Sequence, residues 1–181
     1  FQGRASMGGN LCTASPAADA VPAMIAADTV CTIAGPDGRR EARVEDIVTG
    51  PGQTSLKAGE MVVDFYFPPR PARSGDAYLR FIPRTEMDIA VVGAGISLTL
   101  DEAGVCSAAR VALGAVAATQ LVVEDGAAAL IGSPLDDAAL EKLDAAARAA
   151  CRPLHDKRGT NPYPPNATHD GTAAWSATQS N

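Results

Sequence analysis

The residues best suited to chemistry lie near the start of the chain, where Gly8 and Gly9 precede a short series of polar side chains. Glycine has no Cβ atom, so a flat or charged ligand can approach its backbone closely. Asn10 and Ser15 add hydrogen-bonding side chains nearby. Asp19 precedes an apolar run, where an acidic residue favours the start of a helix. The pattern indicates a phosphate- or cofactor-binding loop, although a glycine turn followed by a capped helix explains it more simply.

The composition narrows the class of protein. The 181 residues are 46% hydrophobic but only 4% aromatic, which predicts a core built mostly from Ala, Val, Leu and Ile. The formal net charge of −6 argues against a nucleic-acid-binding protein, which needs a basic face. No apolar run is long enough to span a membrane and no signal peptide is visible, so we expect a cytoplasmic protein.

The four cysteines are too far apart in the sequence to form a CxxC element; they are Cys12, Cys31, Cys106 and Cys151. This spacing favours four buried or half-buried thiols in a reduced compartment. It argues against a zinc or iron–sulfur site in this chain. The sequence also shows no grouping of His, Cys and Asp that would indicate nucleophilic catalysis.

The first part of the chain is predicted to combine one short helix with three strands. The apolar run 20–27 favours a helix, with Pro22 tolerated in its first turn. Residues 30–34 and 41–47 alternate as two strands of a hairpin, joined by a Gly-Pro-Asp-Gly turn. The third strand is expected over 61–67, which is rich in Val and Phe.

The proline-rich stretch 68–75 indicates a linker, and we place a domain boundary there. Strands are then predicted over 77–82, 89–100 and 105–113, and helices over 124–131 and 137–151. This order predicts an α+β fold in which helices pack on one face of a small three-stranded antiparallel sheet. We therefore expect domains at 1–70 and 73–160, followed by a disordered tail at 161–181.

Several separated motifs together resemble one family in the correct order. "SMGGNLCTASPAAD" is similar to the GGN…SP..D segment of the FAD-binding (medium) subunit of molybdenum hydroxylases, and "EDIVTGPGQTSLKAGEMVVDFYFPP" to the end of its flavin domain. "YLRFIPRTEMDIAVVGAGISLTL", "ARVALGAVAATQLVVEDGAAALIGSPLD" and "DKRGT" resemble its C-terminal domain. This family includes the medium subunit of aerobic carbon monoxide dehydrogenase and the flavin domain of xanthine dehydrogenase. The resemblance implies that residues 1–70 are the C-terminal half of a flavin-binding domain.

The resemblance also implies a set of FAD contacts: Ser6, Gly8, Gly9 and Asn10 along the flavin and its diphosphate, Ser15 and Asp19 beyond them, Val62 on the ring and Arg80 at the flavin edge. Asp19 is expected to accept hydrogen bonds from the ribityl chain, or to serve only as a helix cap. Val62 belongs to a core strand in either case, and an arginine such as Arg80 is more often a solvated surface residue. Asp88 matches a further family position and is expected to be structural.

The implied function is electron transfer. In this family 2Fe-2S clusters and a molybdopterin cofactor lie in partner subunits, and FAD passes electrons from the clusters to an external acceptor. No catalytic acid, base or nucleophile is expected in this chain. The family has another glycine-rich phosphate loop upstream of the GGN segment, which this chain lacks. We therefore expect the chain alone to bind FAD weakly or not at all; the alternative is a non-catalytic remnant that does not bind FAD by itself.

Overall fold

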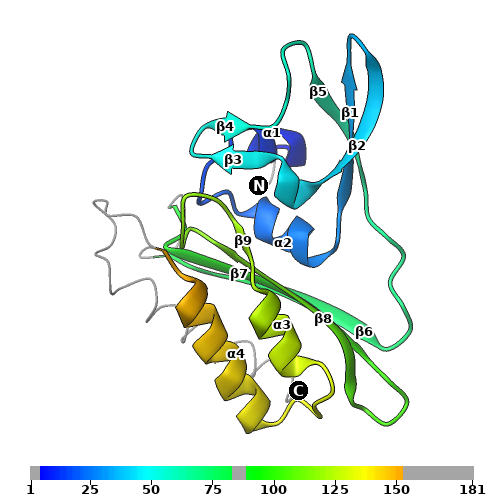
Figure 1. The fold of residues 1–181 in the computed structure, drawn as a ribbon, viewed down its shortest axis with the longest axis vertical. Coiled ribbons are helices and arrows are strands. Elements are labelled where there is room, and N and C mark those ends of the chain that lie inside the picture. The colour runs from blue at the N-terminus through cyan, green and yellow to red at the C-terminus, as the bar shows by residue number, and fades with distance from the viewer. Residues whose placement is uncertain (1–4, 83–88, 153–181) are drawn as a thin grey trace.

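The computed structural model describes residues 5–82 and 89–152. The first part of this chain contains α1 (Met7–Cys12), α2 (Ala20–Ala26), β1 (Val30–Gly35), β2 (Gly38–Arg43), the 3-10 turn η1 (Val44–Asp46), β3 (Val48–Gly50), β4 (Gln53–Thr54) and β5 (Met61–Tyr66). The second part contains β6 (Ser74–Phe81), β7 (Val92–Leu100), β8 (Cys106–Gly114), β9 (Leu121–Val122), α3 (Glu124–Leu130) and α4 (Asp137–Ala150). Figure 1 shows α2 lying between the two groups of strands.

The first sheet has the strand order β2-β1-β5, and all its pairs are antiparallel. β1 and β2 form the predicted hairpin, with Gly35 opposite Gly38 and a φ of +111° at Gly38. Side chains on one face, including Cys31 and Ile33 of β1, pack into a core shared with α1 and α2. This core fixes the positions of α1, which contains Gly8, Gly9 and Asn10, and of α2, which Asp19 precedes.

The second sheet has the strand order β6-β7-β8-β9, with antiparallel pairs throughout. Its core is filled by aliphatic side chains such as Leu113, Leu130 and Leu143, from β8, α3 and α4. Asp136 begins α4 by accepting a hydrogen bond from the N–H of Ala139 at 3.0 Å. The predicted α+β class is confirmed, but the sheet has four strands rather than three, because the two-residue strand β9 pairs with β8.

The other face of this sheet is covered by α2, on the side opposite α3 and α4 (Figure 1). The helix backbone lies directly on the strands: a Cβ atom added to Gly95 would lie 2.6 Å from the carbonyl oxygen of Pro22. The pairing of β7 with β8 continues without a shift through Gly93 and Gly95. The structure therefore shows close approaches at these two glycines and no bulge between them.

Some predicted boundaries are wrong. β2 begins at Gly38, immediately after the tight turn, and ends at Arg43 instead of continuing to residue 47. The reason is that Val44 turns into the first core as part of η1 and is fully buried. β7 begins at Val92, whereas the sequence predicted a start at Ile89. Asp88, the DKRGT motif and the predicted tail lie outside the described residues, and the division into domains at 1–70 and 73–160 stays a prediction.

No helix within residues 5–82 and 89–152 is both long and apolar enough to cross a membrane. Three of the four cysteines (Cys31, Cys106 and Cys151) are buried, whereas Cys12 is exposed. Burial raises the pKa of the Cys31 and Cys106 thiols, which keeps them protonated near neutral pH.

Candidate cofactor site

The glycine pair that suggested a binding loop lies in a helix. Gly8 and Gly9 are part of α1, and the Ser6 hydroxyl accepts a hydrogen bond from the N–H of Gly9 at 3.0 Å, as an N-cap does. Leu11 of the same helix is fully buried in the first core. Burial of this side chain and the cap together outweigh the low helix propensity of glycine. The prediction of a loop is therefore wrong at these residues.

The cap of α2 comes from Asn10 and not from Asp19. The Oδ1 atom of Asn10 accepts a hydrogen bond from the N–H of Ala20 at 2.9 Å. Asp19 occupies the N-cap position, but its backbone is helical and its side chain makes no capping hydrogen bond. The expectation that Asp19 serves only as a helix cap is contradicted. Its carboxylate is directed elsewhere.

Asp19 forms an ion pair with Arg80 of β6. The distance between Asp19 Oδ2 and Arg80 Nη1 is 2.6 Å, and the side chains keep 16% and 37% of their surface exposed. The hydroxyl of Tyr78, two residues before Arg80 on the same strand, lies 3.5 Å from Asp19 Oδ1. Burial, followed by the charge of Asp19, raises the pKa of Tyr78 and keeps it a neutral hydrogen-bond donor. Tyr78 was not predicted, although the period of two along a strand places it on the same face as Arg80.

Gly93 leaves space for the side chain of Tyr78. A Cβ atom there would lie 2.8 Å from the hydroxyl of Tyr78. Gly93 pairs with Arg80 across β6 and β7, so the phenol ring lies over the neighbouring strand. The bare backbone of β7 therefore allows Tyr78 to lie beside Asp19.

The remaining predicted residues lie in α1, in β5 and in the segment before α2. Val62 and Phe65 of β5 are half-buried and pack against the first core. A Cβ atom added to Gly8 would have Cε2 of Phe65 as its nearest neighbour outside the helix, at 3.9 Å. The backbone of α1 is therefore open at this residue. The Ser15 hydroxyl accepts a hydrogen bond from the N–H of Ala17 at 3.3 Å and shapes the segment before α2. The structure thus brings Asp19 and Arg80 into contact, and connects them to α1 through Asn10.

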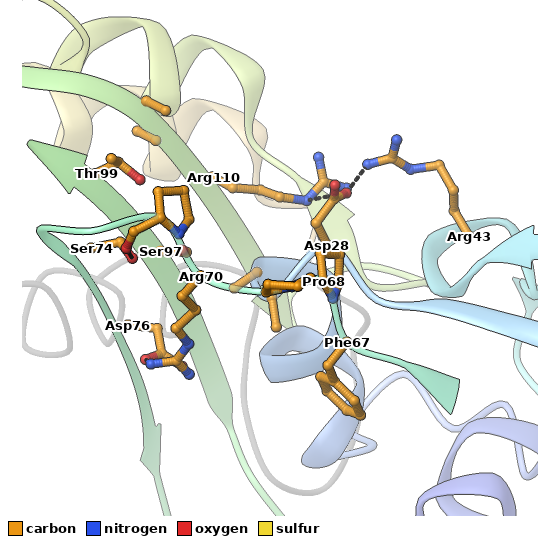
Figure 2. A pocket seen from close by; sticks show the side chains of 16 residues that line it. Asp28, Arg43, Phe67, Pro68, Arg70, Ser74, Asp76, Ser97, Thr99 and Arg110 are labelled. Atoms are coloured by element: carbon orange, nitrogen blue, oxygen red, sulfur yellow. Dashed lines mark hydrogen bonds and ion pairs between the residues drawn. The ribbon is translucent and has the colours of Figure 1, made fainter. Parts of the chain in front are cut away.

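A cavity of about 630 Å³ lies elsewhere, and none of the eight predicted residues lines it. It is bounded by the end of α2, the prolines after β5 and the strands β6 to β8, including Ser97 and Thr99. Figure 2 shows Arg43 and Arg110 approaching Asp28 at its edge.

The charges around this cavity are already paired. Arg110 also contacts Glu45 at 2.5 Å, and Arg70 pairs with Asp76. Burial favours a higher pKa for Glu45, but Arg110 and Arg43 outweigh it and lower the pKa. None of the residues that the resemblance implies as FAD contacts lines this cavity, so we do not assign the cofactor to it.

Comparison with known proteins identifies the family. The CO dehydrogenase flavoprotein C-terminal domain matches residues 77–168, and the FAD binding domain in molybdopterin dehydrogenase matches residues 2–70. The chain belongs to the FAD-binding subunit family of the molybdenum hydroxylases. This finding confirms the resemblance that the sequence motifs indicated.

Individual relatives agree with the family assignment. The carbon monoxide dehydrogenase medium chain of Afipia carboxidovorans is 32% identical over 158 residues, which cover 87% of this chain and 54% of that protein. A xanthine dehydrogenase FAD-binding subunit of Escherichia coli is 32% identical over 140 residues, or 77% of this chain and 48% of that protein. The chain therefore spans about half the length of these relatives.

The fold agrees with a solved member of the family. A carbon monoxide dehydrogenase of Hydrogenophaga pseudoflava, solved without the Mo-pyranopterin moiety of its molybdenum cofactor, superimposes with a TM-score of 0.88 at 30% identity. The match covers 93% of this chain and 58% of that chain. The arrangement of α2 between two sheets therefore belongs to a known flavoprotein-subunit fold.

The residues present fit part of an FAD molecule. The exposed fractions of Asp19 and Arg80 leave a carboxylate that can accept hydrogen bonds from hydroxyls and a guanidinium that can donate to carbonyl oxygens. The open backbone at Gly8 lies beside an aromatic side chain, Phe65, which suits a flat ring system. The side-chain oxygens of Ser6 and Asn10 are already used within the protein, so these two residues shape the backbone.

Proposed function

We propose that this chain forms the part of an FAD-binding subunit that holds the ribityl chain and the edge of the flavin, in a molybdenum-containing dehydrogenase. The observation that supports this proposal most strongly is the Asp19–Arg80 ion pair. The two residues are 61 positions apart and belong to the two separately matched family domains. The resemblance to one family implied a flavin contact for each of them, and the fold brings the two side chains to 2.6 Å.

Each proposed contact has a defined role. Asp19 accepts hydrogen bonds from the ribityl hydroxyls, and Arg80 donates to the flavin edge and balances the charge of Asp19. Ser6 and Asn10 fix α1 and the start of α2, and thereby hold the backbone of Gly8 and Gly9 in place. Val62 supplies apolar surface toward the ring from β5, and Ser15 holds the turn before Asp19. FAD, when bound, supplies electron transfer to an external acceptor.

The partners follow from the same family. We propose that a small subunit with 2Fe-2S clusters and a large molybdopterin-binding subunit deliver the electrons, in a cytoplasmic complex. The substrate binds to the large subunit in this proposal, so the residues described here do not select it. Binding of FAD by this chain alone stays a prediction of weak or absent affinity.

Weak binding can be mapped by NMR on the ¹⁵N-labelled chain, which has a mass of 18.5 kDa. FAD is added up to about 1 mM, a concentration at which interactions of about −4 kcal/mol become half-saturated. We expect saturable shifts at the amides of Gly8, Asp19 and Arg80, and none at Ser97 or Thr99 of the cavity. ADP is the matched control, because it carries the diphosphate without the flavin and ribityl groups.

The outcomes separate the two hypotheses. Shifts at Asp19 and Arg80 with FAD but not with ADP support a flavin-binding role, and Asp19→Asn should reduce them. Shifts around Ser97 would place the ligand in the cavity and contradict the proposed contacts. The absence of any saturable shift would favour the alternative, a non-catalytic domain that does not bind FAD by itself.

A further inference from the structure

The segment 15–19, which leads to Asp19, is held by the loop that follows β8. The side-chain amide of Gln120 donates from Nε2 to the carbonyl oxygens of Ser15 and Pro16, at 2.8 and 3.0 Å. The N–H of Ala115 donates to the same Pro16 carbonyl at 2.8 Å. The carbonyl oxygens of Ser15 and Pro16 therefore accept three hydrogen bonds from the second part of the chain.

The strand before this loop is shaped to allow the contact. A Cβ atom on Gly114, the last residue of β8, would lie 2.6 Å from Cγ of Pro22 and 3.8 Å from the carbonyl oxygen of Pro16. Both the segment and the first turn of α2 therefore lie against bare backbone. Gln120, at the other end of the loop, adds its two hydrogen bonds to this contact.

The hydrogen-bond partners of Gln120 show which end of its side-chain amide holds the segment. Two carbonyl acceptors identify the near end of the amide as nitrogen, since oxygen could not donate to them. The Oε1 atom is buried and has no hydrogen-bond partner within the described part of the chain. An unpaired buried oxygen costs free energy. The stabilising contribution of the polar group therefore comes from its two N–H donors.

We infer that Gln120 is a positioning residue for the candidate cofactor site. By fixing the Ser15 and Pro16 carbonyls, it sets the path of the segment that ends at Asp19, and hence the meeting of Asp19 with Arg80. Residue 120 thus connects the CO dehydrogenase C-terminal domain to the loop of the FAD-binding domain. The importance of this connection for flavin binding rests on the proposed function.

The test uses two substitutions at this position and one control. Gln120→Leu removes both donors, and Gln120→Glu keeps the shape but presents carboxylate oxygens to two carbonyls. Leu140→Ala is the control, because Leu140 packs on the second core through α4 and makes no hydrogen bond to the segment. Hydrogen exchange is followed at the amide of Ala18, which donates to the Ser15 carbonyl at 3.0 Å.

We expect exchange at Ala18 to accelerate about tenfold in Gln120→Leu and more in Gln120→Glu, as loss of hydrogen bonds worth about 1.4 kcal/mol predicts. Denaturant is used to match the global stability of all variants. At matched stability, Leu140→Ala should exchange at the wild-type rate. Unchanged exchange in both Gln120 variants, or equal acceleration in Leu140→Ala, would overturn the inference.

A second readout separates this inference from the proposed function. FAD-induced NMR shifts at Asp19 and Arg80 should require about tenfold more FAD in Gln120→Glu than in Leu140→Ala. Equal FAD requirements in these two variants would overturn the role of Gln120 in flavin binding. If the unmodified chain shows no FAD-induced shifts at all, the alternative of a domain that does not bind FAD by itself is favoured, and the exchange at Ala18 alone decides whether Gln120 positions the segment.

Discussion

Gly95→Ala is the substitution that best tests how the second sheet supports the candidate site. The new Cβ would lie 2.6 Å from the carbonyl oxygen of Pro22, 2.9 Å from its carbonyl carbon and 3.3 Å from the nitrogen of Ala23. All three are backbone atoms of α2, so rotation of a side chain cannot relieve the overlap. An ordinary contact begins at 3.4 Å, and the helix must retreat by the difference between 3.4 and 2.6 Å, about 0.8 Å.

The magnitude follows from overpacking of a dense interior. Insertion of one methyl group into such a contact costs about 1–3 kcal/mol. For a chain of this size, each kcal/mol lowers the melting temperature by about 2–4 °C, so we expect a fall of about 2–12 °C. Because α2 begins one residue after Asp19, its retreat also moves this carboxylate away from Arg80.

Thermal unfolding followed by circular dichroism measures this effect, and Gly75→Ala is its matched control. Gly75 also lies in a strand, β6, but a Cβ atom there would meet nothing within 4 Å. The control should be unchanged or slightly stabilised, by up to about 1 kcal/mol, because alanine restricts the unfolded chain more than glycine does. If Gly95→Ala melts at the same temperature as Gly75→Ala, the direct packing of α2 on β7 is refuted.

Three further predictions concern single contacts. Arg40 lowers the pKa of Glu60 to about 2, below its ordinary value, so the stability that this pair contributes should be lost as the pH falls from about 4.5 to 2. Glu60→Gln should make the melting temperature less dependent on pH over this range, and an unaltered pH dependence would contradict the pairing. Asp136→Ala should remove the cap on Ala139 and cost about 1 kcal/mol, whereas Asp136→Asn should restore most of it in denaturant titrations. Leu143→Ala should cost about 2–5 kcal/mol in the same titration, because Leu143 is buried in the second core, and a smaller loss would indicate a collapsed cavity.

Elements with a strong pattern were predictable from the sequence. The hairpin of β1 and β2 follows from alternation around a Gly-Pro-Asp-Gly turn, and α4 follows from apolar residues at helical spacing after Asp136. α1 was not predictable, because two glycines in six residues disfavour a helix. Its stability comes from burial of Leu11 in a core built from residues distant in the sequence, which local propensity does not report.

The sequence assigned a cofactor role to glycines that differ from those shaping the candidate site in the structure. It attached chemical meaning to Gly8 and Gly9, yet the glycines that decide the geometry are Gly93, Gly95 and Gly114, where side chains or a helix cross bare strands. These positions let Tyr78 reach over β7 and let α2 lie on the sheet, and this arrangement sets Asp19 opposite Arg80. A glycine within a strand pattern signals such a crossing but cannot name the partner, because the partner depends on how distant elements pack. The positions of the two charged residues relative to each other are therefore a property of the second sheet, and substitutions in β7 should alter the site without touching any proposed flavin contact.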